Sequence, residues 1–185
     1  AYLRQWRRRS SRRPPGRTTH IHFAFCDHYE PFWGRADVAT ARARVRRWVE
    51  SYPRIAAAHR DSDGRHPQHS FFYPEEEYDE QILDGLAGLC RAGFGEVEVH
   101  LHHDNDTAAH LAATLERYAR LLSERHGLLR RDPLTGQPLF AFIHGNWALD
   151  NSRPDGRWCG VADELSVLVA AGCRVVMTMP SAPSD

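Results

Sequence analysis

A structural unit that occurs twice in this sequence constrains its fold more than any other feature. In each copy an amphipathic helical pattern ends at Ala-Gly and a short apolar segment follows, at residues 82–99 and 161–177. Glycine commonly closes a helix because it adopts the left-handed conformation without strain. Each copy therefore predicts a helix that leads directly into a buried strand.

The rest of the chain continues this alternation of helices and strands. Hydrophobic periodicity predicts five strands and four helices. The strands are expected at 19–27, 69–73, 96–102, 139–143 and 173–179, and the helices at 38–52, 78–92, 107–122 and 161–171. Strands that alternate with helices predict a parallel sheet with right-handed crossovers. The first strand is not followed by a glycine-rich phosphate loop, which disfavours an open nucleotide-binding sheet. We therefore expect an α/β fold built as a parallel (β/α) barrel.

Length and charge indicate one domain after a basic leader. A chain of 185 residues suffices for a single buried core, which we assign to residues 19–185. Residues 1–17 hold seven arginines and no acid, and we expect the leader at 1–18 to be disordered. This leader is the only segment that indicates contact with nucleic acid or anionic lipid. The sequence does not indicate an oligomeric state.

Membrane and disulfide signals are weak in this sequence. No apolar run approaches the roughly 18 residues of a membrane span, and no signal-peptide pattern follows the arginines. We therefore expect a cytoplasmic protein without a transmembrane segment. The four cysteines are widely spaced and form no CxxC pair, so they are expected to be small core residues.

Residues that can bind metal ions or transfer protons follow the ends of four predicted strands. They are Asp27, His28 and Glu30 after the first strand, Glu75 after the second, His100, His102 and Asp104 at the third, and His144, Asn146 and Trp147 after the fourth. Within the third strand, Glu98, His100 and His102 share one face because side chains alternate. In a (β/α) barrel the carboxyl ends of the strands carry the active site. We therefore expect these residues to form one site.

The chemistry of these groups is that of a metal-dependent hydrolase. Two or three imidazoles with a carboxylate suit zinc or another divalent transition metal. A carboxylate outside the ligand set can take a proton from the water that such an ion activates, and a histidine can protonate the leaving group. Asp27, His28, His100, His102 and His144 supply the parts for such a hydrolase. The aromatic residues near the strand ends either stack on a sugar ring or pack in the core.

Two short motifs resemble those of the polysaccharide deacetylase (NodB-homology) superfamily. Phe25-Cys-Asp27-His28 is similar to its strand-one motif, and Glu96-Val-Glu-Val-His100 to its strand-three motif. The resemblance implies a base at Asp27 and metal ligands at His28 and His100. The family's second motif histidine falls on Asp104, with His102 and His103 as possible substitutes. With this resemblance, the hypothesis assigns catalysis to Asp27 and His144, metal binding to His28, His100, His102 and Asp104, and substrate binding to Glu30, Glu75, Asn146 and Trp147. The resemblance also implies a partial, seven-stranded barrel, so that this chain would be truncated at its C-terminus, and removal of an acyl group from a carbohydrate.

Two alternatives are open at this point. His20-Ile-His22, followed by Asp27, is similar to the metal-binding motif of PHP-type phosphoesterases and amidohydrolases. This alternative requires the first strand to end early, because His20 and His22 otherwise lie at its start. The third hypothesis is a catalytically inactive carbohydrate-binding barrel, which the departures at His28 and Asp104 from the family motifs suggest.

Overall fold

The protein contains a parallel sheet in which the strands lie side by side in chain order. The computed structural model describes residue 16 and residues 18–178. Its parallel strands are β1 (Phe25–His28), β2 (His69–Pro74), β3 (Gly95–Leu101), β5 (Pro138–His144) and β6 (Cys173–Val176). A two-residue strand, β4 (Arg130–Arg131), pairs with β5 in the antiparallel direction.

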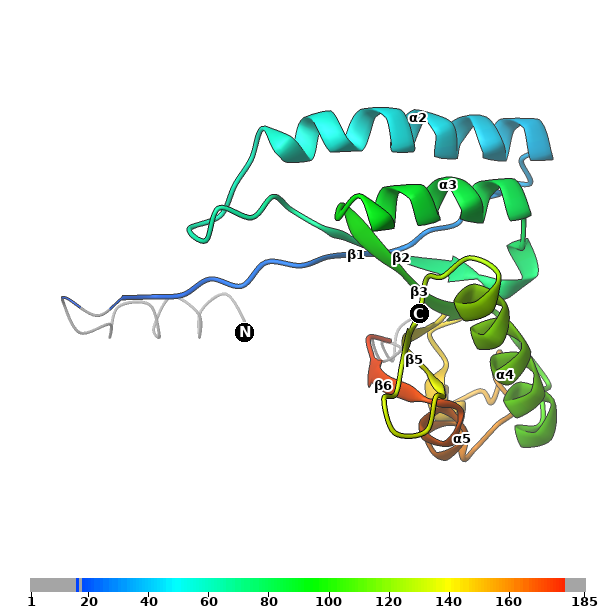
Figure 1. Cartoon of the computed structure of the whole chain (residues 1–185). Coiled ribbons are helices and arrows are strands. Elements are labelled where there is room, and N and C mark those ends of the chain that lie inside the picture. Colours follow the sequence, from blue (N-terminus) through cyan, green and yellow to red (C-terminus); the bar gives the residue numbers. More distant parts are fainter. Residues whose placement is uncertain (1–15, 17, 179–185) are drawn as a thin grey trace.

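This strand order confirms the predicted parallel α/β architecture. A doubly wound sheet reverses its strand order at a switch point. The described strands instead run β1-β2-β3-β5-β6 without reversal (Figure 1). Closure of this sheet into a barrel stays a prediction, and the predicted leader lies almost entirely outside the described residues.

Four α-helices connect the strands. They are α2 (Val38–Ala57), α3 (Glu80–Arg91), α4 (Ala108–Glu124) and α5 (Glu164–Ala171), with short 3-10 helices η1 (Glu75–Glu77) and η2 (Leu149–Asn151). The side chains of Asp37, Asp79 and Thr107 cap the first turns of α2, α3 and α4 by accepting backbone N–H groups. The ribbon view shows α2 beside α3 and α4 beside α5 (Figure 1). Among the described residues, no helix combines the length and the hydropathy that crossing a membrane requires.

Two predicted boundaries are wrong for tertiary reasons. We expected the helix from Val38 to end before Pro53, but α2 continues to Ala57. Tyr52 and Ala56 are both buried, so packing on either side of Pro53 offsets the hydrogen bond that proline cannot make. The first strand begins at Phe25 and not at residue 19, because Phe25 pairs with His69, the first residue of β2.

The strand register divides the sheet into two chemically different faces. Phe71, Val97 and Phe142 lie on one face and pack in the hydrophobic core with the helices. On the other face His28 is registered with Phe72, and Phe72 is in turn registered with Glu98. The polar residues of the third strand thus lie on the face opposite the helices, as the alternation in the sequence predicts.

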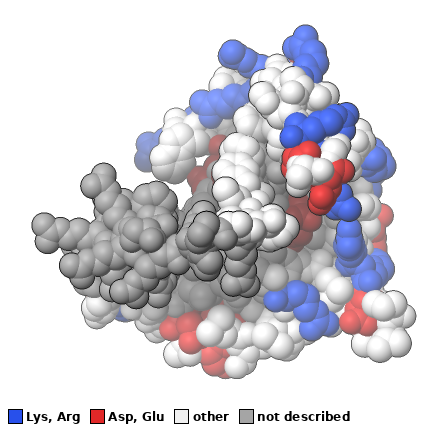
Figure 2. All heavy atoms as spheres, turned by 90° about the vertical axis from the view of Figure 1, so that its left-hand side faces the viewer, with Lys and Arg blue, Asp and Glu red and all other residues white. Residues whose placement is uncertain are grey.

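The arginines of α2 give one edge of the molecule a basic surface. Figure 2 shows blue side chains along the top of the molecule, where α2 lies. Some of these arginines have structural partners. Arg42 forms a bidentate pair with Asp79 at the start of α3, and Arg44 donates hydrogen bonds to the carbonyl oxygens of Pro31 and Trp33. The two hydrogen bonds of Arg44 fix the connection between β1 and α2.

Candidate metal centre

A carboxylate oxygen of Glu30 lies among three imidazole rings. Its Oε1 is 3.3 Å from His100 Nε2, 3.5 Å from His28 Nδ1 and 3.6 Å from His102 Nε2. His28 and Glu30 are at and just beyond the end of β1, and His100 and His102 are at the end of β3. The ligand atoms of His28, Glu30 and His100 lie within 4.8 Å of one another, so these three residues could hold a metal ion.

The orientation of His100 is fixed by the backbone of the neighbouring strand. Its Nδ1 lies 2.9 Å from the carbonyl oxygen of Ile143 in β5, which can only accept a hydrogen bond. The proton of neutral His100 is therefore on Nδ1, and the lone pair of Nε2 points at the Glu30 carboxylate. Burial lowers the pKa of His100, which favours this neutral form. A proton or a metal cation can lie between two electron-rich atoms that face one another, and a backbone carbonyl on the far nitrogen is the usual support of a metal-binding histidine.

Glu30 is ionised over the whole physiological pH range. The neighbouring rings of His100 and then His28 lower its pKa to about 2, and their effect outweighs that of burial. Its side chain is only 11% exposed, so solvent compensates little of this charge. The group therefore combines a fixed negative charge with neutral imidazole nitrogen, which is the donor set that a divalent transition metal prefers.

His102 is held beside Glu30 by a second carboxylate. Glu76 accepts hydrogen bonds from both the Nδ1 and the backbone N of His102. The hydrogen bond to Glu76 raises the pKa of His102, against the effect of burial. The ring also fills the space next to Gly145, where a Cβ atom would lie 2.2 Å from His102 Cδ2. Glycine at this position is thus a steric requirement of the His102 ring.

His28 links the group to an exposed tryptophan. Trp147 Nε1 donates a hydrogen bond of 3.3 Å to His28 Nε2, so His28 carries its own proton on Nδ1, toward Glu30. Ligation through Nδ1 would move that proton to Nε2 and break the contact with Trp147. The Trp147 side chain is half exposed. Its indole ring lies at the edge of the site.

The two residues predicted to be catalytic lie on the opposite face of the sheet. Asp27 is registered with Phe71 and His144 with Leu101, both on the side that the helices cover. The carboxylate of Asp27 bonds to His69 Nε2 at 2.8 Å. His144 contacts His103 and Glu164 instead of Glu30. The structure therefore brings His28, His100 and His102 together with Glu30, but not Asp27 or His144.

The other predicted site residues form hydrogen bonds or ion pairs outside the Glu30 group. Asp104 accepts the backbone N–H of Trp158 at 2.7 Å, Glu75 pairs with Arg117 at 2.7 Å, and Asn146 donates to the carbonyl oxygen of His103 at 3.0 Å. These contacts connect loops and helices at the same end of the sheet.

His20 and His22 are exposed in the segment before β1. They precede the start of β1, whereas His28 lies at its end, so the geometry does not join them to the Glu30 group.

Sequence reasoning missed the roles of Glu30, Glu76 and Gly145 in this arrangement. A signal for Glu30 was present, since alternation places it on the same side as His28, two residues earlier. Glu76 and Gly145 carried no such signal, because their importance depends on where the His102 ring lies.

Comparisons of this chain with family models, with curated proteins and with solved structures return no match. The likeness to polysaccharide deacetylases therefore rests on the two short motifs alone, and it stays a prediction.

Proposed function

We propose that this protein is a metal-dependent hydrolase that removes an acyl group from a carbohydrate. The observation that carries this proposal is the position of Glu30 Oε1, which lies 3.3 Å from Nε2 of a backbone-anchored histidine, His100. Glu30 and His100 would hold a divalent cation, zinc by the chemistry of the donors, and His28 would complete a three-residue set. Three protein ligands leave a coordination position open, as in catalytic zinc sites.

The cation supplies Lewis acidity to the site. The remaining chemistry belongs to His102 and Glu76. Neutral His102 takes a proton from the attacking water and then gives it to the leaving nitrogen as the acyl C–N bond breaks. Glu76 stabilises the protonated ring through the hydrogen bond to Nδ1. Because the ring is wedged against Gly145, its orientation is set before substrate binds.

A carbohydrate substrate is supported by the aromatic surface next to the cluster. The half-exposed ring of Trp147 touches His28, which places an apolar plane beside the proposed ligands. Such a ring can stack on the apolar face of a sugar. Trp147→Ala is expected to raise KM more than it lowers kcat. Trp33→Ala, which removes another exposed tryptophan, is the matched control.

The test of this function is release of acetate from N-acetylated chito-oligosaccharide by purified protein supplied with zinc. His100→Ala should abolish the reaction, and His59→Ala, which changes an exposed histidine, should leave it intact. Absence of both a bound divalent ion and acetate release would favour the carbohydrate-binding alternative. Hydrolysis of phosphate esters in place of acetamides would favour the phosphoesterase alternative.

A further inference from the structure

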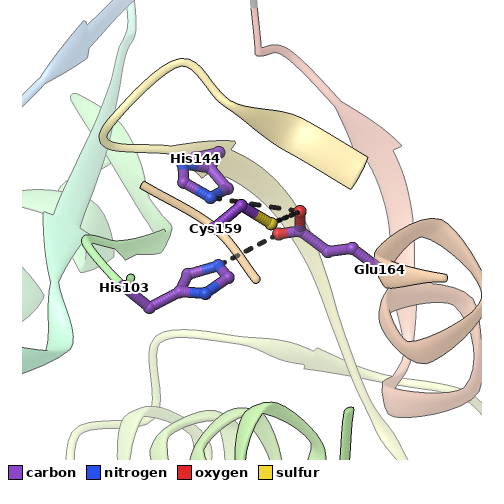
Figure 3. A group of neighbouring side chains, drawn as sticks. All are labelled: His103, His144, Cys159 and Glu164. Atoms are coloured by element: carbon purple, nitrogen blue, oxygen red, sulfur yellow. Dashed lines mark hydrogen bonds and ion pairs between the residues drawn. The ribbon is translucent and has the colours of Figure 1, made fainter. Parts of the chain in front are cut away.

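A second group of potential ligands lies on the helix-covered face of the sheet, apart from the Glu30 cluster. It consists of His103, His144, Cys159 and Glu164, whose ligand atoms lie within 4.8 Å of one another. Figure 3 shows the side chains of His103, His144 and Cys159 directed toward the Glu164 carboxylate. Glu164 Oε1 is 3.2 Å from His103 Nε2, and Glu164 Oε2 is 3.2 Å from Cys159 Sγ and 4.0 Å from His144 Nε2.

This second group is closed to solvent and incompletely satisfied. The side chains of His144 and Glu164 are fully buried, Cys159 is buried, and the His103 side chain is 10% exposed. Nε2 of His144 has no hydrogen-bond partner among the described residues, although it is directed at Glu164. Buried polar nitrogens are nearly always paired. This nitrogen therefore indicates a missing partner in the space between the four side chains.

The charge of the group also calls for a positive partner. Glu164 is a buried carboxylate whose described contacts are the His103 ring, the Cys159 thiol and the backbone N–H of Asp150. With the thiol deprotonated, two negative charges and two neutral imidazoles would balance a single divalent ion. Four protein donors of sulfur, nitrogen and oxygen type would fill the tetrahedral coordination of zinc and leave no open position, as in structural zinc sites.

The loop that carries Cys159 needs such a restraint. Between β5 and α5 the chain contains only the short helix η2, and several residues other than glycine have left-handed backbone conformations. Trp158, next to Cys159, has φ 69°, which is unusual for a bulky residue. Gly160 packs so closely on the chain that an added Cβ would lie 2.5 Å from the backbone N of Asp106. A strained segment of this kind persists when the surrounding structure holds it in place.

We propose that His103, His144, Cys159 and Glu164 bind a structural zinc ion that fixes the 145–163 loop to the ends of β3 and β5. The ion joins four separate parts of the chain, namely the segment after β3, the end of β5, the loop and the start of α5. On binding, Cys159 releases its proton to solvent and the thiolate becomes a ligand. His144 moves its proton to Nδ1, which ends the 3.2 Å hydrogen bond that this nitrogen now accepts from the backbone N–H of Asn146.

Cobalt substitution separates this site from the Glu30 cluster, because only the second group contains sulfur. The full chain is prepared with Co²⁺ in place of zinc and its absorption spectrum is recorded. A thiolate-to-cobalt charge-transfer band in the near ultraviolet is expected in the wild type and in Cys90→Ser, whose cysteine lies in α3. Cys159→Ser should lose the band. His100→Ala should keep it even though it removes a ligand of the proposed active site.

A wild-type measurement covers the case in which Cys159→Ser does not fold. X-ray absorption at the zinc edge should show a sulfur neighbour at about 2.3 Å. Absence of sulfur from the zinc environment, or a charge-transfer band that survives in folded Cys159→Ser, would overturn the proposal. If the wild-type protein shows the charge-transfer band but releases no acetate, the proposed function is contradicted and the structural zinc site is not.

Discussion

At the scale of single residues, the main feature of this protein is the pairing of two largely buried carboxylates, Glu30 and Glu164, with imidazole nitrogens. Glu30 lies against His100 on one face of the sheet, and Glu164 lies against His103 on the other. Histidines at 100, 102 and 103 of a single strand end thus reach two different groups. The outcome depends on strand alternation, which sends His102 and His103 in different directions.

The charge of Glu30 is expected to control metal affinity at the first group. Glu30→Gln keeps the shape of the side chain but removes the negative charge, so zinc affinity should fall by at least about 100-fold. Calorimetric titration of metal-free protein measures this change. Glu50→Gln, on the exposed side of α2, is the control and should bind like the wild type. Equal affinities for the two variants would remove Glu30 from the ligand set.

The pair formed by His102 and Glu76 should determine the acidic side of the pH profile. Glu76 raises the pKa of His102, so the neutral ring needed as a base is lost as the pH falls through this raised value. Glu76→Gln lowers the pKa of His102, and the acidic limb of kcat/KM should move to lower pH. NMR titration of the His102 ring gives the pKa directly. An unchanged limb in a variant whose His102 pKa has fallen would assign the proton transfer to another group.

The ion pair between His102 and Glu76 should also make the free energy of unfolding depend on pH. Because the folded-state pKa of His102 is raised, its ion pair with Glu76 stabilises the fold below the pKa of the unfolded chain. This contribution is lost as the pH rises through the folded-state value. The difference in unfolding free energy between wild type and Glu76→Gln should therefore shrink with increasing pH, and chemical denaturation at several pH values measures it.

The steric role of Gly145 can be tested with a matched glycine. In Gly145→Ala the new methyl group would overlap the His102 ring, which should destabilise the fold by about 1–3 kcal/mol and displace the ring. Gly88→Ala, in an exposed position of α3 with no atom near the added Cβ, should instead stabilise by up to about 1 kcal/mol. Thermal unfolding of both variants provides the comparison. Similar melting temperatures would show that His102 can move at no cost.

At the scale of elements, a residue that caps one helix also joins that helix to its neighbour. Asp79 caps α3 by accepting the backbone N–H of Ile82, and the same carboxylate binds Arg42 of α2. The two helices are thereby joined at one end of the α2–α3 layer. Pro53 shows the complementary effect, because burial of Tyr52 and Ala56 maintains α2 through a residue that normally ends a helix.

Removal of the shared cap should cost more than removal of a simple one. Asp79→Ala deletes both the cap and the Arg42 pair, so a loss of about 1–2 kcal/mol is expected. Asp37→Ala deletes only the cap at the exposed start of α2 and should destabilise the fold less. Denaturant unfolding ranks the two variants, and the reverse order would show that the Arg42 pair does not contribute.

At the scale of the whole molecule, the parallel sheet separates two groups of potential metal ligands. The helix-covered face contains the hydrophobic core and, at its end, the group around Glu164. The opposite face contains Glu98, His28 and His100, and its end contains Glu30. Because both groups lie at the carboxyl ends of strands, residues that look like one site in the sequence form two sites in the structure.

Local patterns in the sequence determined the elements of this protein and identified His28, His100 and His102 as potential ligands. Periodicity placed the helices and the parallel strands, and alternation placed Glu98 and His100 on a common face, because both depend on neighbouring residues only. The tertiary structure alone decided which strand ends meet, where α2 ends and β1 begins, and how Cys159 and Glu164 reach His103 and His144. Strand register and the path of a long loop depend on packing between distant segments, and that information is not contained in any local pattern.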